Sequence, residues 1–120
     1  MENICETRIT GMGQGALDFV EDHILILFGN QAGNGLEEYS VQITMPQVNR
    51  DVAPGDILDF GGHTYQVTAI GHKAMETFRL LGHCTLHFDG KKAPVLPGVI
   101  HVEEKPLPEV RVGDTIRFYC

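Results

Sequence analysis

The stretch GDILDF, residues 55–60, returns in altered form as GDTIRF at residues 113–118. Each copy joins a Gly-Asp pair to a short segment with the composition of a half-buried β-strand. Glycine permits a tight backbone at such a turn, and an aspartate side chain accepts hydrogen bonds from the N–H groups that follow it. The recurrence therefore indicates that the chain changes direction in the same way at two turns.

Further matches extend the repeat upstream of the Gly-Asp turns. HILILFGN (23–30) aligns with HCTLHFDG (83–90), and TRITG (7–11) aligns with VTAIG (67–71). Each half then reads strand, helix, strand, strand, Gly-Asp turn, strand. We predict an all-β fold, a closed or partly open β-barrel of two similar halves with one or two short helices, in which strand edges are paired. The alternative is a chance match between segments that share a β pattern.

The 120 residues are expected to form one domain. Alternation and turn residues predict eight strands, at Thr7–Thr10, His23–Phe28, Tyr39–Thr44, Ile57–Phe60, Thr64–Ile70, His83–Phe88, Val99–Glu103 and Thr115–Tyr119. Two helices are predicted, at Ala16–Asp22 and Lys73–Leu81, and Gly82 is a natural stop for the second.

Composition excludes several classes of function. The formal net charge is −7, and Lys91-Lys92 is the only basic pair, so the chain lacks the basic surface of a nucleic-acid-binding protein. Three cysteines without a CxxC pair indicate neither a disulfide framework nor a cysteine zinc site. A charged amino-terminal segment and short apolar runs predict a cytoplasmic protein with no direct membrane insertion. GMGQG (11–15) departs from GxGxxG, and we interpret it as a loop whose N–H groups could still cradle a phosphate.

The segment LGHCTLHFDG (81–90) holds the most distinctive chemistry. On an alternating strand one face carries His83, Thr85 and His87, and the other carries Cys84, Leu86 and Phe88. Exposed imidazoles suit a phosphate-carrying nucleophile, a metal site or a structural polar role. Because His83 and His87 would stand about 13 Å apart along the strand, they are poorly placed to share one ion. We therefore expect no metal ion, with the metal and structural interpretations as alternatives.

Four segments, in this order and spacing, resemble one known family. They are LEEY (36–39), GGHTYQVTAIG (61–71), LGHCTLHFDG (81–90) and PGVIHV (97–102). The family is the glucitol/sorbitol-specific IIA component of the bacterial phosphoenolpyruvate-dependent sugar phosphotransferase system. The resemblance covers nearly the whole chain, and LGHxTLxFDG followed by PGxxHV is its specific part. It implies a cytoplasmic protein-histidine phosphotransferase component without a cofactor, which accepts phosphate from HPr and passes it to the IIB component of an IIB/IIC sorbitol permease.

One position departs from the family pattern. The resemblance implies a phosphohistidine a few residues after LEEY, in the segment that reads SVQITMPQ (40–47), where the matching position is Ile43 and no histidine occurs. Either that assignment does not hold throughout the family, or this chain carries phosphate elsewhere, or it has lost the activity. The third case predicts a non-catalytic regulatory or scaffolding barrel as the alternative function.

His83 is the phosphohistidine candidate. A phosphate-carrying imidazole has to be accessible, has to present an unprotonated nitrogen, and works best when a partner holds its other nitrogen. His83 directly follows Gly82, which we expect to let backbone N–H groups approach a phosphate, and Thr85 offers a neighbouring hydroxyl.

The partners of His83 are expected from the resemblance. It retains His101 and His63, which we predict to orient the ring of His83 without replacing it as the nucleophile. It does not retain His87, which we predict to be a solvated residue of the same strand face.

Overall fold

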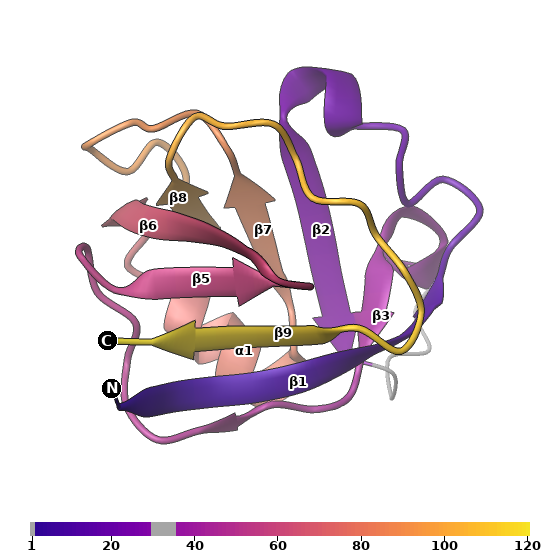
Figure 1. Cartoon of the computed structure of the whole chain (residues 1–120), viewed down its shortest axis with the longest axis horizontal. Coiled ribbons are helices and arrows are strands. Elements are labelled where there is room, and N and C mark those ends of the chain that lie inside the picture. Colours follow the sequence, from indigo (N-terminus) through magenta and orange to yellow (C-terminus); the bar gives the residue numbers. More distant parts are fainter. Residues whose placement is uncertain (1, 30–35) are drawn as a thin grey trace.

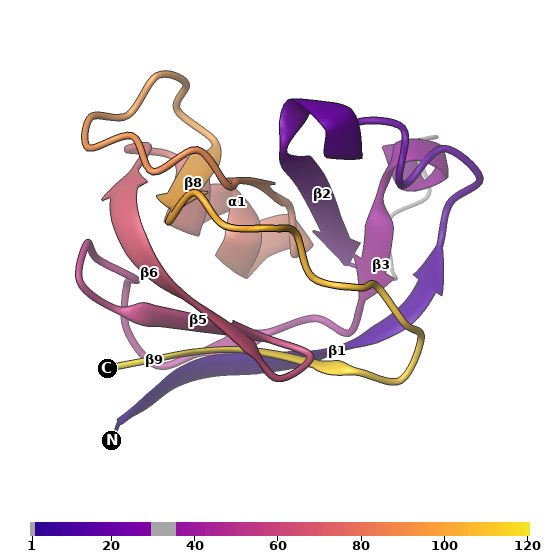
Figure 2. The same cartoon turned by 45° about the horizontal axis from the view of Figure 1, so that its top comes forward.

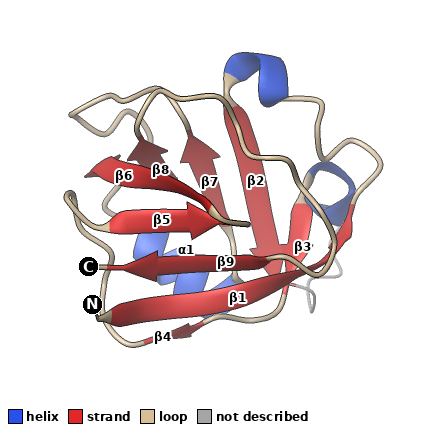
Figure 3. Cartoon of the chain, in the orientation of Figure 1, coloured by secondary structure: helices blue, strands red, loops and turns tan. Residues whose placement is uncertain are grey.

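The computed structural model describes residues 2–29 and 36–120, which fold into a curved sheet closed on itself (Figures 1 and 3). Its strands are β1 (Asn3–Met12), β2 (Ile24–Gly29), β3 (Val41–Ile43), β4 (Gln47–Val48), β5 (Ile57–Phe60), β6 (His63–Ile70), β7 (Cys84–His87), β8 (Val99–Val102) and β9 (Thr115–Tyr119). Its helical elements are α1 (Ala74–Leu81) and the 3₁₀ turns η1 (Val20–Asp22) and η2 (Leu36–Tyr39).

Strand pairing closes the barrel. The strands follow one another in the order β3-β2-β7-β8-β6-β5-β9-β1, and β1 pairs in turn with β3, so these eight form a ring. The short β4, which the sequence did not predict, pairs with the side of β1. Each of the eight ring strands has neighbours on both sides, which satisfies the backbone hydrogen bonds that an open edge would expose. The predicted barrel is confirmed.

The two halves have equivalent topology. The antiparallel pair β1–β3 corresponds to β6–β8, and the parallel pair β2–β3 corresponds to β7–β8. The Gly-Asp turns correspond as well: the Gly55 N–H donates to the Val67 carbonyl and the Gly113 N–H donates to the Ile9 carbonyl, both at 2.8 Å. The two glycines have φ of 97° and 98°, a region that favours glycine. The repeat predicted from the sequence is therefore a repeat of structure.

The first predicted helix is wrong. Residues 14–19 form successive turns, and only η1 is helical in this segment. The N–H groups of Gly13 and Gly15 donate to the carbonyls of Ser40 and Glu38, so this loop is tied to η2 and the residue after it, and these two amides are not free to cradle a phosphate. A stretch as short as Ala16–Asp22 is a marginal helix unless it buries an apolar face.

The second predicted helix is confirmed as α1, because it does bury such a face. Ala74, Met75 and Phe78 are buried, whereas Leu80 on the other side is 72% exposed. α1 packs at the end of the barrel where β7 begins (Figures 1 and 2). Within the described part of the chain, no helix has the length and apolar character needed to cross a membrane.

Side chains fill the barrel interior. Cys84, Leu86 and Phe88 are fully buried, as the alternation of that strand predicts, and Phe88 packs edge-on against Tyr65 with ring centroids 4.8 Å apart. The opposite face of β7 therefore turns away from the core, and the polar side chains of that face are the ones available for chemistry.

Candidate functional site

β7 has a histidine at each end, and the structure separates the two. His83 lies just before the strand, where α1 ends, and His87 is its last residue. Four residues of extended backbone hold the two about 13 Å apart. We name them the His83 site (His83 with Thr77, Gly82 and Phe28) and the His87 site (His87, Asp89 and His101).

The end of α1 fixes the backbone of the His83 site. The Gly82 N–H donates to the Phe78 carbonyl at 2.9 Å, and the His83 N–H donates to the Thr77 carbonyl at 3.3 Å. The Thr77 hydroxyl donates to the His83 carbonyl at 2.8 Å. Gly82 has a φ of 65°, and a Cβ there would lie 2.8 Å from the backbone of Gly29. This backbone geometry explains why position 82 is a glycine. The Gly82 N–H already donates to the Phe78 carbonyl, so it does not support the expected contact with a phosphate.

Among the described residues, the ring of His83 has packing contacts and no hydrogen bond. It is half-buried against Phe28, with ring centroids 4.9 Å apart and an interplanar angle of 43°. Its Nδ1 is buried without a hydrogen-bond partner, and among the described residues Nε2 has none either and reaches the surface. The ring is partly accessible, and in the part of the chain that the structure describes no hydrogen bond selects its tautomer.

The structure does not bring the expected partners to His83. His101 lies on β8 opposite His87 and is fully buried. His63 is exposed at the start of β6, where it lines a hollow with Lys105 and Leu107. Thr85 faces the groove beside His87.

Asp89 connects the two imidazoles of the His87 site. The parallel register of β7 and β8 places His87 opposite His101, and their rings stack with centroids 5.7 Å apart at 26°. Asp89, in the turn after β7, lies between their Nδ1 atoms: Oδ1 is 2.9 Å from that of His101 and Oδ2 is 3.2 Å from that of His87. Oδ1 also accepts the Lys91 N–H at 3.1 Å. The side chain that sequence reasoning treated as solvated therefore has an ordered partner.

These contacts determine the ionisation of the site. Burial alone would raise the pKa of the Asp89 carboxyl, but hydrogen bonds from His101 and the Lys91 N–H outweigh it and lower that pKa. A carboxylate accepts only, so the His101 Nδ1 that is hydrogen-bonded to it carries a proton. The side chain of His87, whose Nδ1 faces Oδ2, is 27% exposed. His101 is fully buried, and its Nε2 has no hydrogen-bond partner.

A small groove of about 190 Å³ opens beside the His87 site. Its walls are mostly apolar, and they consist of Ile24, Thr85, His87, Lys91, Val95, Leu96, Val99 and His101. Val95 and Leu96 are each 60% exposed, so the rim of the groove is apolar as well.

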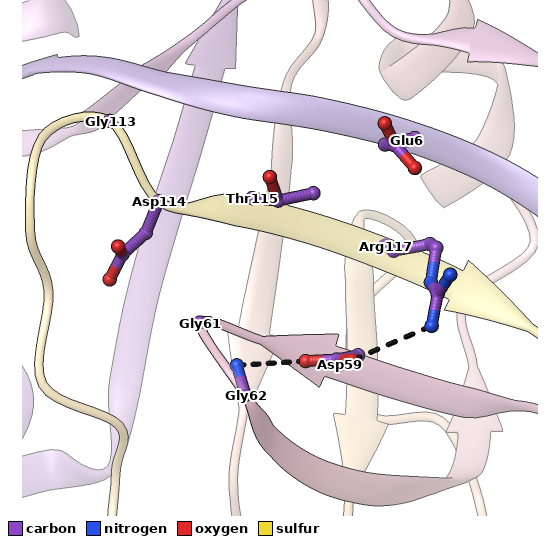
Figure 4. A pocket seen from close by; sticks show the side chains of 8 residues that line it. All are labelled: Glu6, Asp59, Gly61, Gly62, Gly113, Asp114, Thr115 and Arg117. Atoms are coloured by element: carbon purple, nitrogen blue, oxygen red, sulfur yellow. Dashed lines mark hydrogen bonds and ion pairs between the residues drawn. The ribbon is translucent and has the colours of Figure 1, made fainter.

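A larger hollow of about 390 Å³ lies elsewhere, between β1, β5 and β9 (Figure 4). Carboxylates of Glu6, Asp59 and Asp114 line it, and its one lining cation, Arg117, is 3.7 Å from Asp59 and already paired with it. An excess of carboxylates repels a phosphoryl group, so we do not assign phosphate chemistry to this hollow.

The position that the family resemblance associates with phosphohistidine is in the barrel core. Ile43 is fully buried on β3, where it pairs with Ile9 of β1 and Gly29 of β2. This chain thus has an apolar core residue at a place where the resemblance implied a nucleophile.

The sequence comparisons with known proteins agree on one family, and a solved structure shares the fold. The family model of the PTS system glucitol/sorbitol-specific IIA component matches residues 4–117. The glucitol/sorbitol-specific EIIA components of Escherichia coli K12 and Shigella flexneri are each 36% identical over 118 residues, covering 98% of this chain and 96% of each relative. A PTS IIA component of Enterococcus faecalis V583 has a similar fold, with a TM-score of 0.82 at 24% identity over 96% of this chain and 99% of that one. The chain therefore belongs to the family of glucitol/sorbitol-specific IIA components of the phosphotransferase system.

Proposed function

We propose that this chain is a cytoplasmic phosphoryl carrier. It accepts a phosphoryl group from HPr on a histidine and passes it to the IIB component of a glucitol/sorbitol permease. Family membership supports the reaction class. The observation that carries the assignment of the acceptor is a histidine of the family motif, His83, whose ring packs against Phe28, whose carbonyl accepts the Thr77 hydroxyl, and whose Nε2 reaches the surface.

The reaction requires little from the protein beyond an accessible and correctly positioned imidazole. The lone pair of Nε2 attacks the phosphorus of phosphorylated HPr, the P–N bond to HPr breaks, and the HPr imidazole keeps the electron pair. The same exchange then runs toward IIB. Positioning supplies most of what such an in-line transfer needs. Phe28 limits the rotation of the ring, and Thr77 fixes the backbone that carries it.

One specific observation favours His87 as a second acceptor. Asp89 Oδ2 lies 3.2 Å from Nδ1 of His87, so a carboxylate stands beside a ring that is 27% exposed and can orient it. Among the described residues, His83 has no such neighbour. We place His83 first because it belongs to the segment LGHxTLxFDG that carries the family resemblance, whereas position 87 falls on a variable place of that segment.

Mapping the phosphate on the unaltered protein tests the proposal. The chain is incubated with enzyme I, HPr and phosphoenolpyruvate, then digested with trypsin at alkaline pH, where phosphohistidine survives. Cleavage after Arg79 and Lys91 yields a peptide with both His83 and His87, so electron-transfer fragmentation is needed to separate them. We expect the phosphate on His83.

Three results would contradict this assignment in different ways. Phosphate on His87 would move the acceptor to the other end of β7. Phosphate on a peptide containing His63 or His101 would rule out both His83 and His87 as the acceptor. No phosphate on the chain under saturating phosphorylated HPr would favour the non-catalytic regulatory or scaffolding barrel.

A further inference from the structure

The His87 site brings together more imidazole and carboxylate groups than phosphoryl transfer requires. A phosphoryl acceptor needs one accessible imidazole, whereas here one ring nitrogen of each histidine and an oxygen of Asp89 all lie within 4.8 Å of one another. His101 is fully buried, so a phosphohistidine on another protein cannot reach it. The transfer reaction therefore leaves the convergence of the three side chains unexplained.

We propose that His87, Asp89 and His101 bind a divalent transition-metal ion, for which Zn²⁺ is the best match. Two imidazole nitrogens and one carboxylate oxygen are typical zinc ligands, whereas Mg²⁺ and Ca²⁺ prefer sites made of oxygen atoms. Three protein ligands leave one position of a tetrahedral ion open. That position is available to water or a small anion from the groove beside the site.

Unsatisfied polar atoms at the site support this proposal. Among the described residues, Asp89 Oδ2 and His101 Nε2 are buried atoms without a hydrogen-bond partner, and both belong to side chains of the cluster. The Nδ1 of His87 approaches Oδ2 to 3.2 Å without forming a hydrogen bond. Such atoms are uncommon in native proteins, and an unoccupied ion position is one of their physical explanations.

The surroundings also have the features of a metal site. The Lys91 N–H donates to Oδ1 of Asp89, in the way that a second layer of hydrogen bonds orients a ligating carboxylate. Ile24, Val95 and Val99 place apolar surface around the polar cluster and limit the access of water. A bound ion would join β7, β8 and the turn between them, at the end of β7 remote from His83. The metal site is thus independent of the proposed phosphoryl acceptor.

Zinc binding to the full chain tests the proposal. The protein is prepared without a polyhistidine tag and with Cys120, its exposed cysteine, replaced by serine, since Cys5 and Cys84 are buried. Equilibrium dialysis against Zn²⁺ with elemental analysis should give one ion per chain. His87→Gln and Asp89→Asn should each lower the affinity at least about tenfold. His63→Gln, which alters an exposed histidine of another region, is the matched control and should bind as the parent does.

A second readout identifies the ligands. Co²⁺ bound at the same site should give the visible absorption of a tetrahedral nitrogen and oxygen environment, without the near-ultraviolet band of a cobalt-thiolate bond. Zn²⁺ should also raise the melting temperature of the parent protein, and the same concentration of Mg²⁺ should not, because an ion that binds the folded state stabilises it.

The proposal is overturned if the parent binds no stoichiometric Zn²⁺, if both variants bind it as the parent does, or if cobalt reports a thiolate ligand. Where circular dichroism shows that a variant has not folded, the imidazole resonances of the parent protein decide instead. Shifts of His87 and His101 on adding Zn²⁺ support the site, and unchanged resonances refute it.

Discussion

The two ends of β7 immobilise a histidine in different ways. At the His83 site the backbone cap of α1 and the ring of Phe28 hold the imidazole, and neither ring nitrogen has a hydrogen-bond partner among residues 2–29 and 36–120. At the His87 site a carboxylate holds two imidazoles by their Nδ1 atoms. Packing leaves the ring nitrogens of His83 available to exchange a phosphoryl group with another protein. A carboxylate between two imidazoles instead selects a tautomer through its hydrogen bond and brings three potential metal ligands together.

The largest expected effect is on the rate of phosphorylation, which should distinguish the two ends of β7. His83→Ala should reduce the rate of phosphorylation by phosphorylated HPr at least about a thousandfold, because the nucleophile itself is removed. His87→Ala should leave the rate within about threefold, since it removes a side chain without contact with His83. Labelled phosphoenolpyruvate measures both rates. Equal losses in the two variants would contradict the division of roles between the ends of β7.

The free energy of unfolding should distinguish the two ends of β7 in the opposite sense, with the larger effect at the His87 site. His101→Ala should lower the free energy of unfolding by about 2–5 kcal/mol, as for other large buried side chains, and it also leaves Asp89 without one donor. His83→Ala should cost about 1 kcal/mol, because its ring is half-exposed and has no hydrogen bond to any described residue. Urea unfolding with a chelator present measures both. A larger loss for His83→Ala would show that His83 is mainly structural.

A smaller change tests the frame of the His83 site. Thr77→Val keeps the size of the side chain but removes the hydroxyl that donates to the His83 carbonyl, which should cost about 0.5–1.5 kcal/mol and slow phosphorylation. Thr77→Ser keeps a hydroxyl and is the matched control. If valine and serine variants are phosphorylated at the parent rate, the hydrogen bond does not position His83.

The smallest effect concerns pH and the His87 site. Because the pKa of Asp89 is lower in the folded state than its ordinary value of 3.8, the folded state holds fewer protons there. Its contribution to stability is complete at neutral pH and is lost as the pH falls through 3.8 toward the folded pKa. The difference in unfolding free energy between the parent and Asp89→Asn should therefore narrow between pH 7 and about pH 3. A constant difference would show that the Asp89 charge does not stabilise the fold.

Local rules account for the parts of the fold that the sequence could predict. The Gly-Asp turns depend on the backbone freedom of glycine, and the two faces of β7 follow from the period of an extended strand. The same local reasoning failed for Ala16–Asp22, where hydrogen bonds to the distant Ser40 and Glu38 hold the loop instead. A local helical preference is weak, and contacts from elsewhere in the chain outweigh it.

The sequence by itself determined the repeated halves, the family and the presence of two histidines, His83 and His87, in one strand segment. Only the tertiary structure decided which groups meet. Along the strand, His83 and His87 are the near pair, and the sequence accordingly argued against a shared ion. The parallel register of β7 and β8 instead places His101, fourteen positions farther on, opposite His87, and the turn after β7 brings Asp89 between them. Such a register depends on how the whole barrel closes, because pairing between strands joined by a long connection is set by the packing of all its neighbours.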